Sequence, residues 1–208
     1  MDASAATDAP YRPSQADAVS IALFSIVGAA IAVWICVQAA IRIVELVSPG
    51  PIRVSAEFLG TPVPAPIGTG GSAVDVALDR ATLTVDALPI ASIAAGVIGQ
   101  ILLAATTVTV VLCLVLLSRN ILRGRVFGRA NSALVGTAGI VGLLGSASVP
   151  FFGNMVANGA FATIGDFDHY AVLSIQPFTF VLGTFVFAII ATAFAVGARL
   201  QRDAEGLV

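Results

Sequence analysis

The stretch from Val19 to Ile41 reads VSIALFSIVGAAIAVWICVQAAI and contains no charged residue. A helix rises about 1.5 Å per residue, so roughly 20 apolar residues are enough to cross the hydrocarbon core of a bilayer. The run exceeds the apolar region of a secretory signal peptide, which is about 7–15 residues, and the segment before it carries more acids than bases. Cys36 is preceded by the large residues Trp34 and Ile35, which argues against a lipidation site. We therefore predict a transmembrane helix here.

Three further apolar runs, at about 90–117, 132–152 and 177–198, have the length of transmembrane helices. The run from 106 to 117, TTVTVVLCLVLL, is rich in β-branched residues that favour a strand in water, but in lipid its length favours a helix, which satisfies its own backbone hydrogen bonds. Charged residues make up 11% of the chain, against about 25% in an average soluble domain. The sequence predicts an all-α membrane protein, a bundle of four transmembrane helices forming one domain over residues 1–208.

The distribution of arginine orients these helices. All ten basic residues of the chain are Arg, a usage that we interpret as that of a GC-rich bacterial genome. Cytoplasmic segments of membrane proteins carry the excess of basic residues. The loop 118–131 holds four Arg and no acid, whereas the segments 48–88 and 153–175 are acidic. We therefore expect a bacterial plasma-membrane protein with both termini and the loop 118–131 in the cytoplasm. The arginines of these three cytoplasmic segments are Arg12, Arg119, Arg123, Arg125, Arg129, Arg199 and Arg202.

The outer segment 48–88 contains alternating apolar residues. Val74, Val76 and Leu78 alternate with polar or small residues, and Leu83 and Val85 do the same in a second short run, so that the two runs indicate the strands of a hairpin. A period of two is typical of a half-buried strand. Because an isolated hairpin is marginally stable, we expect a further strand from the later segment to join it. The prediction is a small extracellular β-sheet formed by the outer segments, with a strand near 170–174 as its third member.

Small residues recur along the third apolar run. They let helix backbones approach closely in lipid, where no hydrophobic effect drives helices together. We therefore expect helix packing at four glycines, Gly136, Gly139, Gly142 and Gly145. A hinge or a dimer face is the functional alternative to packing within the chain.

Few side chains in the spans suggest chemistry. Arg42 and Glu45 lie one turn apart at the outer end of the first span, where they can pair with each other near the interface. We interpret Cys36 and Cys113 as packing residues at different depths, too far apart for a disulfide.

The only histidine, His169, follows Asp166 and Asp168, but we find no second cluster that would complete a metal site. The sequence contains no nucleophile elbow, phosphate-binding glycine loop, HExxH or CxxC motif. We therefore expect neither an enzyme nor a bound cofactor or metal.

The basic loop resembles a known family. In ILRGRVFGRANSALV, residues 121–135, the pattern G-x-x-F-x-x-x-N is formed by Gly124, Phe127 and Asn131. It is similar to the loop after the second span of the DUF2975 family of uncharacterised bacterial four-helix membrane proteins, although Gly128 and Arg129 replace the usual polar pair. The ending GARLQRDAEGLV also resembles that family, at Gly197, Leu200, Asp203, Glu205, Leu207 and Val208. Members are often encoded beside a helix-turn-helix regulator, which implies a cytosolic DNA-binding partner.

These observations favour a membrane-embedded regulatory or interaction protein. The outer sheet would sense an envelope condition, and the inner surface would hold a cytosolic regulator without contacting nucleic acid itself. The candidate partner contacts are Arg123, Arg125, Phe127, Arg129, Leu207 and Val208. The loop arginines have two other interpretations, binding of anionic lipid headgroups and simple fixing of topology. The alternative function is a small transporter or channel subunit. The small number of polar groups in the spans argues against transport. A third interpretation is a structural membrane protein.

The topology can be tested by cysteine labelling in intact cells. A membrane-impermeant thiol reagent should modify a cysteine introduced at Thr69 and spare one at Gly124, measured above the background of Cys36 and Cys113. The reverse labelling pattern would overturn the orientation.

Overall fold

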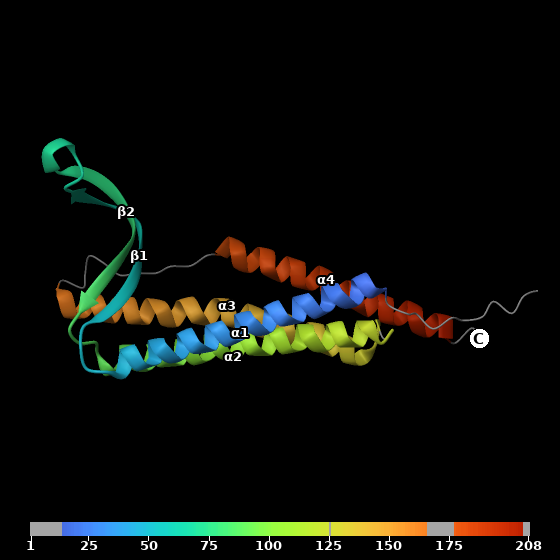
Figure 1. The fold of residues 1–208 in the computed structure, drawn as a ribbon. Coiled ribbons are helices and arrows are strands. Elements are labelled where there is room, and N and C mark those ends of the chain that lie inside the picture. Colours follow the sequence, from blue (N-terminus) through green and yellow to red (C-terminus); the bar gives the residue numbers. More distant parts are fainter. Residues whose placement is uncertain (1–13, 125, 166–176, 206–208) are drawn as a thin grey trace, which may run out of the picture. The chain divides into compact units, whose positions relative to one another are not determined.

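The computed structural model describes residues 14–124, 126–165 and 177–205. Within them lie four α-helices and one β-hairpin (Figure 1). In chain order the elements are α1 (Gln15–Val47), β1 (Ile52–Ala65), the 3-10 turn η1 (Thr69–Gly71), β2 (Val74–Val85), α2 (Ile90–Leu122), α3 (Arg129–Ile164) and α4 (Pro177–Glu205).

The contacts between residues divide the chain into two compact units. The hairpin unit comprises Ile35–Ala105 and Leu144–Phe180, and the Arg-rich unit comprises Met1–Trp34, Thr106–Leu143 and Val181–Val208. Each of the helices α1 to α4 contributes residues to both units. The hairpin lies wholly in the first unit and the connection between α2 and α3 wholly in the second.

Each of the helices α1 to α4 is long and apolar enough to cross a membrane, which confirms that the four predicted apolar runs form helices of that length. Even the β-branched run from Thr106 is helical, as expected of a segment that must satisfy its own backbone. Large apolar side chains remain exposed on these helices, with Ile26 of α1 and Phe185 of α4 each 67% accessible. Contiguous exposed apolar surface of this kind requires a lipid or protein covering.

Helix α3 is longer than the sequence predicts. It continues through Pro150 to Ile164, so residues 153–164, which we assigned to an outer segment, are helical. Small side chains explain the extension: Ala157 and Ala160 are buried against the base of the hairpin, so that packing continues after the strongly apolar run has ended. At the other end, α2 and α3 take up both ends of the basic loop and leave 123–128 as the connection.

The sheet of the described residues is a two-stranded antiparallel hairpin. The two short strands predicted within 74–85 form one continuous strand, β2, and its partner is β1, which the sequence analysis did not assign. Ile52 pairs with Val85 at the base, and the register shifts between Glu57 and Thr61. The expected strand near 170–174 lies outside the described residues.

The base of the hairpin forms part of the core of its unit. Ile52, Val54 and Ala56 are buried and alternate with exposed Arg53 and Ser55, as the pleat requires. They pack with buried residues of the three neighbouring helices, namely Leu46, Ala95, Val156, Ala157 and Ala160. This packing supplies the apolar support that an isolated hairpin lacks.

Polar contacts reinforce the hairpin. The Arg42 guanidinium donates to Glu45 Oε2 at 2.8 Å and to the carbonyl of Arg53, which ties the end of α1 to β1. The pair that we predicted from one-turn spacing is therefore present, with a strand contact in addition. Across the hairpin, Arg80 forms an ion pair with Glu57 in the directly opposite position.

The glycines of α3 differ in what surrounds them. A Cβ at Gly139 would lie 1.9 Å from the Phe187 ring of α4, a distance that no packed structure allows. At Gly142 the nearest atom, from Val110, is 3.9 Å away, and at Gly136 nothing lies within 4 Å. Gly145 is buried. Among Gly136, Gly139 and Gly142, only Gly139 therefore marks a close helix contact, where the aromatic ring occupies the space of a side chain.

This contrast predicts the effects of two matched substitutions. Gly139→Ala should lower the free energy of unfolding by about 1–3 kcal/mol, because the added methyl overpacks the contact with Phe187. Gly136→Ala, one turn away in open space, should leave stability unchanged or raise it by up to about 1 kcal/mol through helix propensity. Thermal unfolding in detergent measures both.

A double mutant provides the control. Phe187→Leu should be less harmful in the Gly139→Ala background than alone, because a smaller side chain relieves the overlap. Equal stabilities for Gly139→Ala and Gly136→Ala would contradict the contact.

Candidate functional site

The connection between α2 and α3 contains a glycine in a left-handed backbone conformation near its start. Helix α2 ends at Leu122, and Gly124 adopts φ +73° while its N–H donates to the Ile121 carbonyl at 2.9 Å. Residues with a Cβ are strained at such a φ, so glycine fits this helix end best. Gly128 does not have a positive φ, and the space around it is open. It is therefore a better position than Gly124 for an inner labelling cysteine.

A buried amide holds the other end of this connection. Asn131, in the first turn of α3, is 1% exposed. Its Nδ2 donates to the Val126 carbonyl at 2.9 Å, and its Oδ1 accepts from Asn120 Nδ2 at 2.7 Å. The side chain therefore joins the end of α2, the connection and the start of α3. Leaving such a buried amide unpaired costs about 1–3 kcal/mol, so these hydrogen bonds fix the loop path.

Phe127 docks the connection onto α4. Its ring lies 5.8 Å, centre to centre, from Phe194, and a Cβ at Gly197 would lie only 2.5 Å from it. Gly197 thus provides the flat surface on which the ring rests. Phe127 remains 39% exposed, so part of the ring still faces outward. These contacts anchor Phe127 within the protein.

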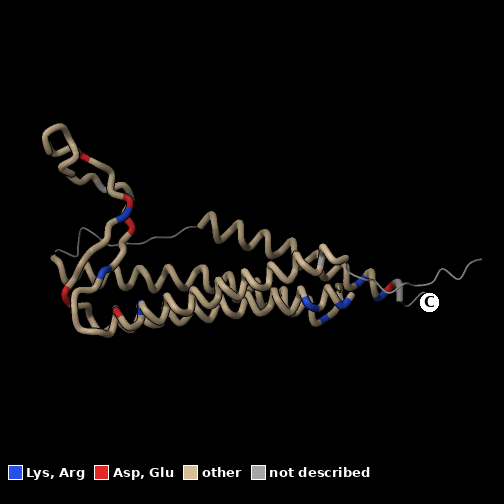
Figure 2. Tube along the Cα trace, viewed as in Figure 1, with Lys and Arg blue, Asp and Glu red and all other residues tan. Residues whose placement is uncertain are grey.

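Arginines surround this docked loop. We call residues 119–132 together with 194–203 the Arg-rich platform. Figure 2 shows the positive residues gathered at the connection and at the end of α4, whereas the long helical stretches carry almost none. Within the described part of the platform, none of the arginines forms an ion pair, although each is exposed: Arg119, Arg123, Arg129, Arg199 and Arg202.

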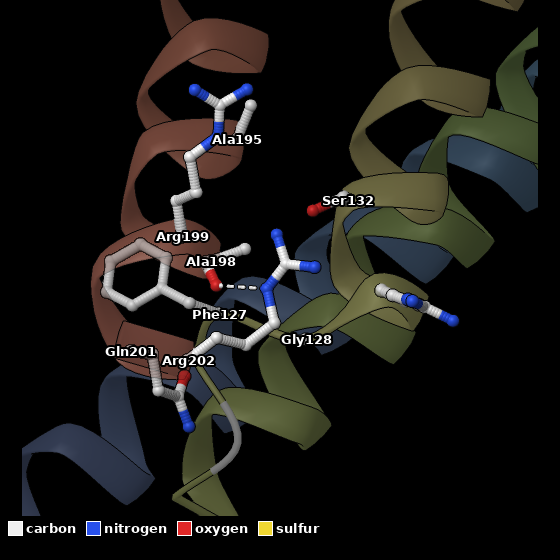
Figure 3. A pocket seen from close by; sticks show the side chains of 9 residues that line it. Phe127, Gly128, Ser132, Ala195, Ala198, Arg199, Gln201 and Arg202 are labelled. Carbon is white, nitrogen blue, oxygen red and sulfur yellow. Dashed lines mark hydrogen bonds between the residues drawn. The ribbon is translucent and has the colours of Figure 1, made fainter. Parts of the chain in front are cut away.

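A cavity of about 510 Å³ lies between the start of α3 and the end of α4 (Figure 3). Its polar lining comes from Ser132 and Gln201 and from the arginines at 129, 199 and 202. Its apolar lining comes from Phe127, Ala195 and Ala198. A second cavity of about 520 Å³ shares Phe127 and Gln201 and is otherwise lined mainly by apolar residues and glycine. The platform therefore combines positive charge with concave apolar surface.

The structure brings together only part of the predicted contact set. Arg123, Phe127 and Arg129 belong to the platform, whereas Arg125, Leu207 and Val208 lie outside the described residues. Arg199 and Arg202, which the sequence pointed to only as topology signals, line the cavity beside Arg129. Their spacing of three residues on a helix was the signal that they share a face.

The described residues offer no metal centre, since no group of three or more His, Cys, Asp or Glu side chains comes together among them. The cluster at Asp166, Asp168 and His169 lies outside the described residues. Cys36 and Cys113 are both free thiols, and Cys113 is buried. Comparisons with protein-family models, curated proteins and solved structures gave no match to this chain.

The amide clamp predicts a change in proteolysis. Asn131→Ala removes both hydrogen bonds and should speed tryptic cleavage within 123–129 about tenfold, because the loop opens more often when the clamp is lost. Cleavage after Arg202, outside the clamp, should keep its rate and serves as the internal control. Mass spectrometry of timed digests measures both sites.

The local effect of the two Asn131 hydrogen bonds can be distinguished from a general loss of stability. Asn120→Ala removes only one of the two bonds and should give a smaller acceleration. If Asn131→Ala accelerates both cleavages equally, the clamp acts on the whole fold and not on the loop.

Proposed function

We propose that this chain is a multi-pass integral membrane protein with a regulatory or interaction function. Its Arg-rich platform holds an acidic cytosolic protein, and its hairpin responds to conditions on the opposite side of the membrane. The observation that carries the proposal is the fixed loop: Asn131 and Phe127 hold a short connection in place while the arginines around it stay without ion pairs. A preorganised charged surface loses little entropy on binding.

The composition of the platform supports a protein partner. Protein interfaces combine apolar anchors with arginine, and the platform offers Leu200, 64% exposed, next to Arg199 and near the exposed edge of Phe127. Electrostatic complementarity speeds association with an acidic partner and excludes basic ones. The resemblance of the loop and the tail to the DUF2975 family adds the kind of partner that we expect, a small helix-turn-helix regulator.

Transport is the weaker candidate. A transport path needs polar groups that face a cavity inside the membrane-spanning region. The buried polar side chains among the described residues are Ser92 and Asn131, and both hydrogen-bond to the protein. Their hydrogen-bonding capacity is used for structure, which leaves the platform as the better-supported site.

The proposal can be tested by photo-crosslinking in cells. A photoreactive amino acid replacing Leu200 should form an adduct with a cytosolic DNA-binding protein, identified by mass spectrometry. The same residue at Ile67, 70% exposed on the hairpin, should not. Neutralising Arg119→Gln and Arg123→Gln should reduce the adduct several-fold at unchanged protein level, because each exposed arginine that pairs with an acidic partner contributes up to about 1 kcal/mol.

Two outcomes would count against this function. One is the absence of any protein adduct from position 200, and the other is the same set of adducts from positions 200 and 67. Membrane insertion is checked separately by resistance to alkaline extraction, so that a failed insertion is not mistaken for a missing partner.

A further inference from the structure

We propose that the cavity between α3 and α4 binds the headgroup of an anionic phospholipid that carries more than one negative charge. The proposal rests on the membrane insertion proposed above, but not on the protein partner. It assigns a ligand to the space lined by Arg129, Arg199 and Arg202, on one side of the platform.

The polar side of the cavity has the donors that a phosphate needs. Arginine guanidinium groups form charge-assisted, often paired, hydrogen bonds with phosphate oxygens. Figure 3 shows Arg202 reaching from α4 into the space beside Ser132 of α3. Arg202 Nε donates to the Ala198 carbonyl at 3.0 Å, which orients the guanidinium, and its remaining N–H groups have no partner among the described residues.

The charge balance favours a multiply charged headgroup. Arg129, Arg199 and Arg202 all line this cavity, and none forms an ion pair with a carboxylate of the described residues. A phosphodiester with a single charge would leave most of this charge uncompensated. The first turn of α3, which lines the same space, adds the positive end of a helix dipole.

The apolar side of the cavity explains why the phosphate should belong to a lipid. Phe127, Ala195 and Ala198 line that side, and the apolar run of α4 ends there, directly before Arg199. Upstream on α4, Val196 and Ile189 are more than half exposed and can contact acyl chains. The cavity therefore lies where an apolar helix meets a charged segment, as a headgroup does in a bilayer. Its volume of about 510 Å³ falls within the roughly 300–1,000 Å³ of typical ligand sites.

The test uses the purified full chain in a neutral detergent. Dioctanoyl phosphatidic acid is titrated and its binding followed by native mass spectrometry, with dioctanoyl phosphatidylcholine, glycerol 3-phosphate and an oligo-glutamate peptide as comparison ligands. We expect saturable binding of phosphatidic acid at least about tenfold tighter than that of each comparison ligand. This ligand series needs no variant, so it decides the question even if a variant fails to fold.

Two variants of equal charge locate the site. Arg199→Gln with Arg202→Gln should weaken phosphatidic acid binding at least about tenfold. Arg119→Gln with Arg123→Gln removes the same charge from platform positions outside the cavity lining and should weaken it less than threefold. Thermal unfolding confirms that both variants are folded before binding is compared.

Each contrary result overturns the proposal in a distinct way. Equal losses of phosphatidic acid binding in the two variants would show that binding depends on the total positive charge and not on the cavity. Equal affinity for glycerol 3-phosphate would assign the cavity to a soluble phosphate, and preference for the peptide would assign it to the protein partner. Equal affinity for phosphatidylcholine would exclude an anionic site. Loss of the Leu200 adduct without loss of lipid binding would refute the partner function alone.

Discussion

A peptide group in an apolar medium has no water to bond, so its N–H and C=O must find partners within the same segment. The long helices of this protein satisfy that requirement, and the same constraint extends to the polar side chains on them. Ser25 and Thr192 donate their hydroxyls to the carbonyls of Ile21 and Ala188, at 2.8 Å each. Such bonding back to the preceding turn removes the cost of exposing a hydroxyl to lipid.

The same constraint explains which parts of the fold the sequence predicts. A run of apolar residues as long as that from Val19 to Ile41 has one solution in lipid, a helix, so the existence and order of α1 to α4 follow directly from hydropathy. The ends of the helices are harder to predict, because they depend on packing. The end of α3 was placed too early, since Gly153 and Asn154 lower the local hydropathy, whereas burial of Ala160 against the hairpin depends on contacts distant in sequence.

Strand β1 was missed for a related reason. Pro62, Pro64 and Gly60 are typical of loops, and they mask the alternation that Ile52 and Val54 begin. The platform was predicted only as a loop rich in arginine. Sequence spacing placed Phe127 and Asn131 in one motif. The packing of the Phe127 ring against Gly197, however, joins residues about 70 positions apart. No local pattern reveals such a contact, and the cavity that depends on it was therefore beyond prediction.

The two prolines of β1 have a consequence for self-association. A two-stranded hairpin has two open edges, and each presents backbone groups that could pair with a strand of another molecule. Pro62 and Pro64 stand opposite Ala77 and Asp75, two residues apart and so on the same side of the strand. Proline is tolerated where its nitrogen faces away from the partner strand, so both nitrogens lie on the open edge and leave it without donors there. A strand from a neighbouring molecule would find acceptors without the alternating donors that a ladder needs. The β1 edge of the hairpin is thus protected near Pro62 and Pro64 against pairing with a strand of another molecule.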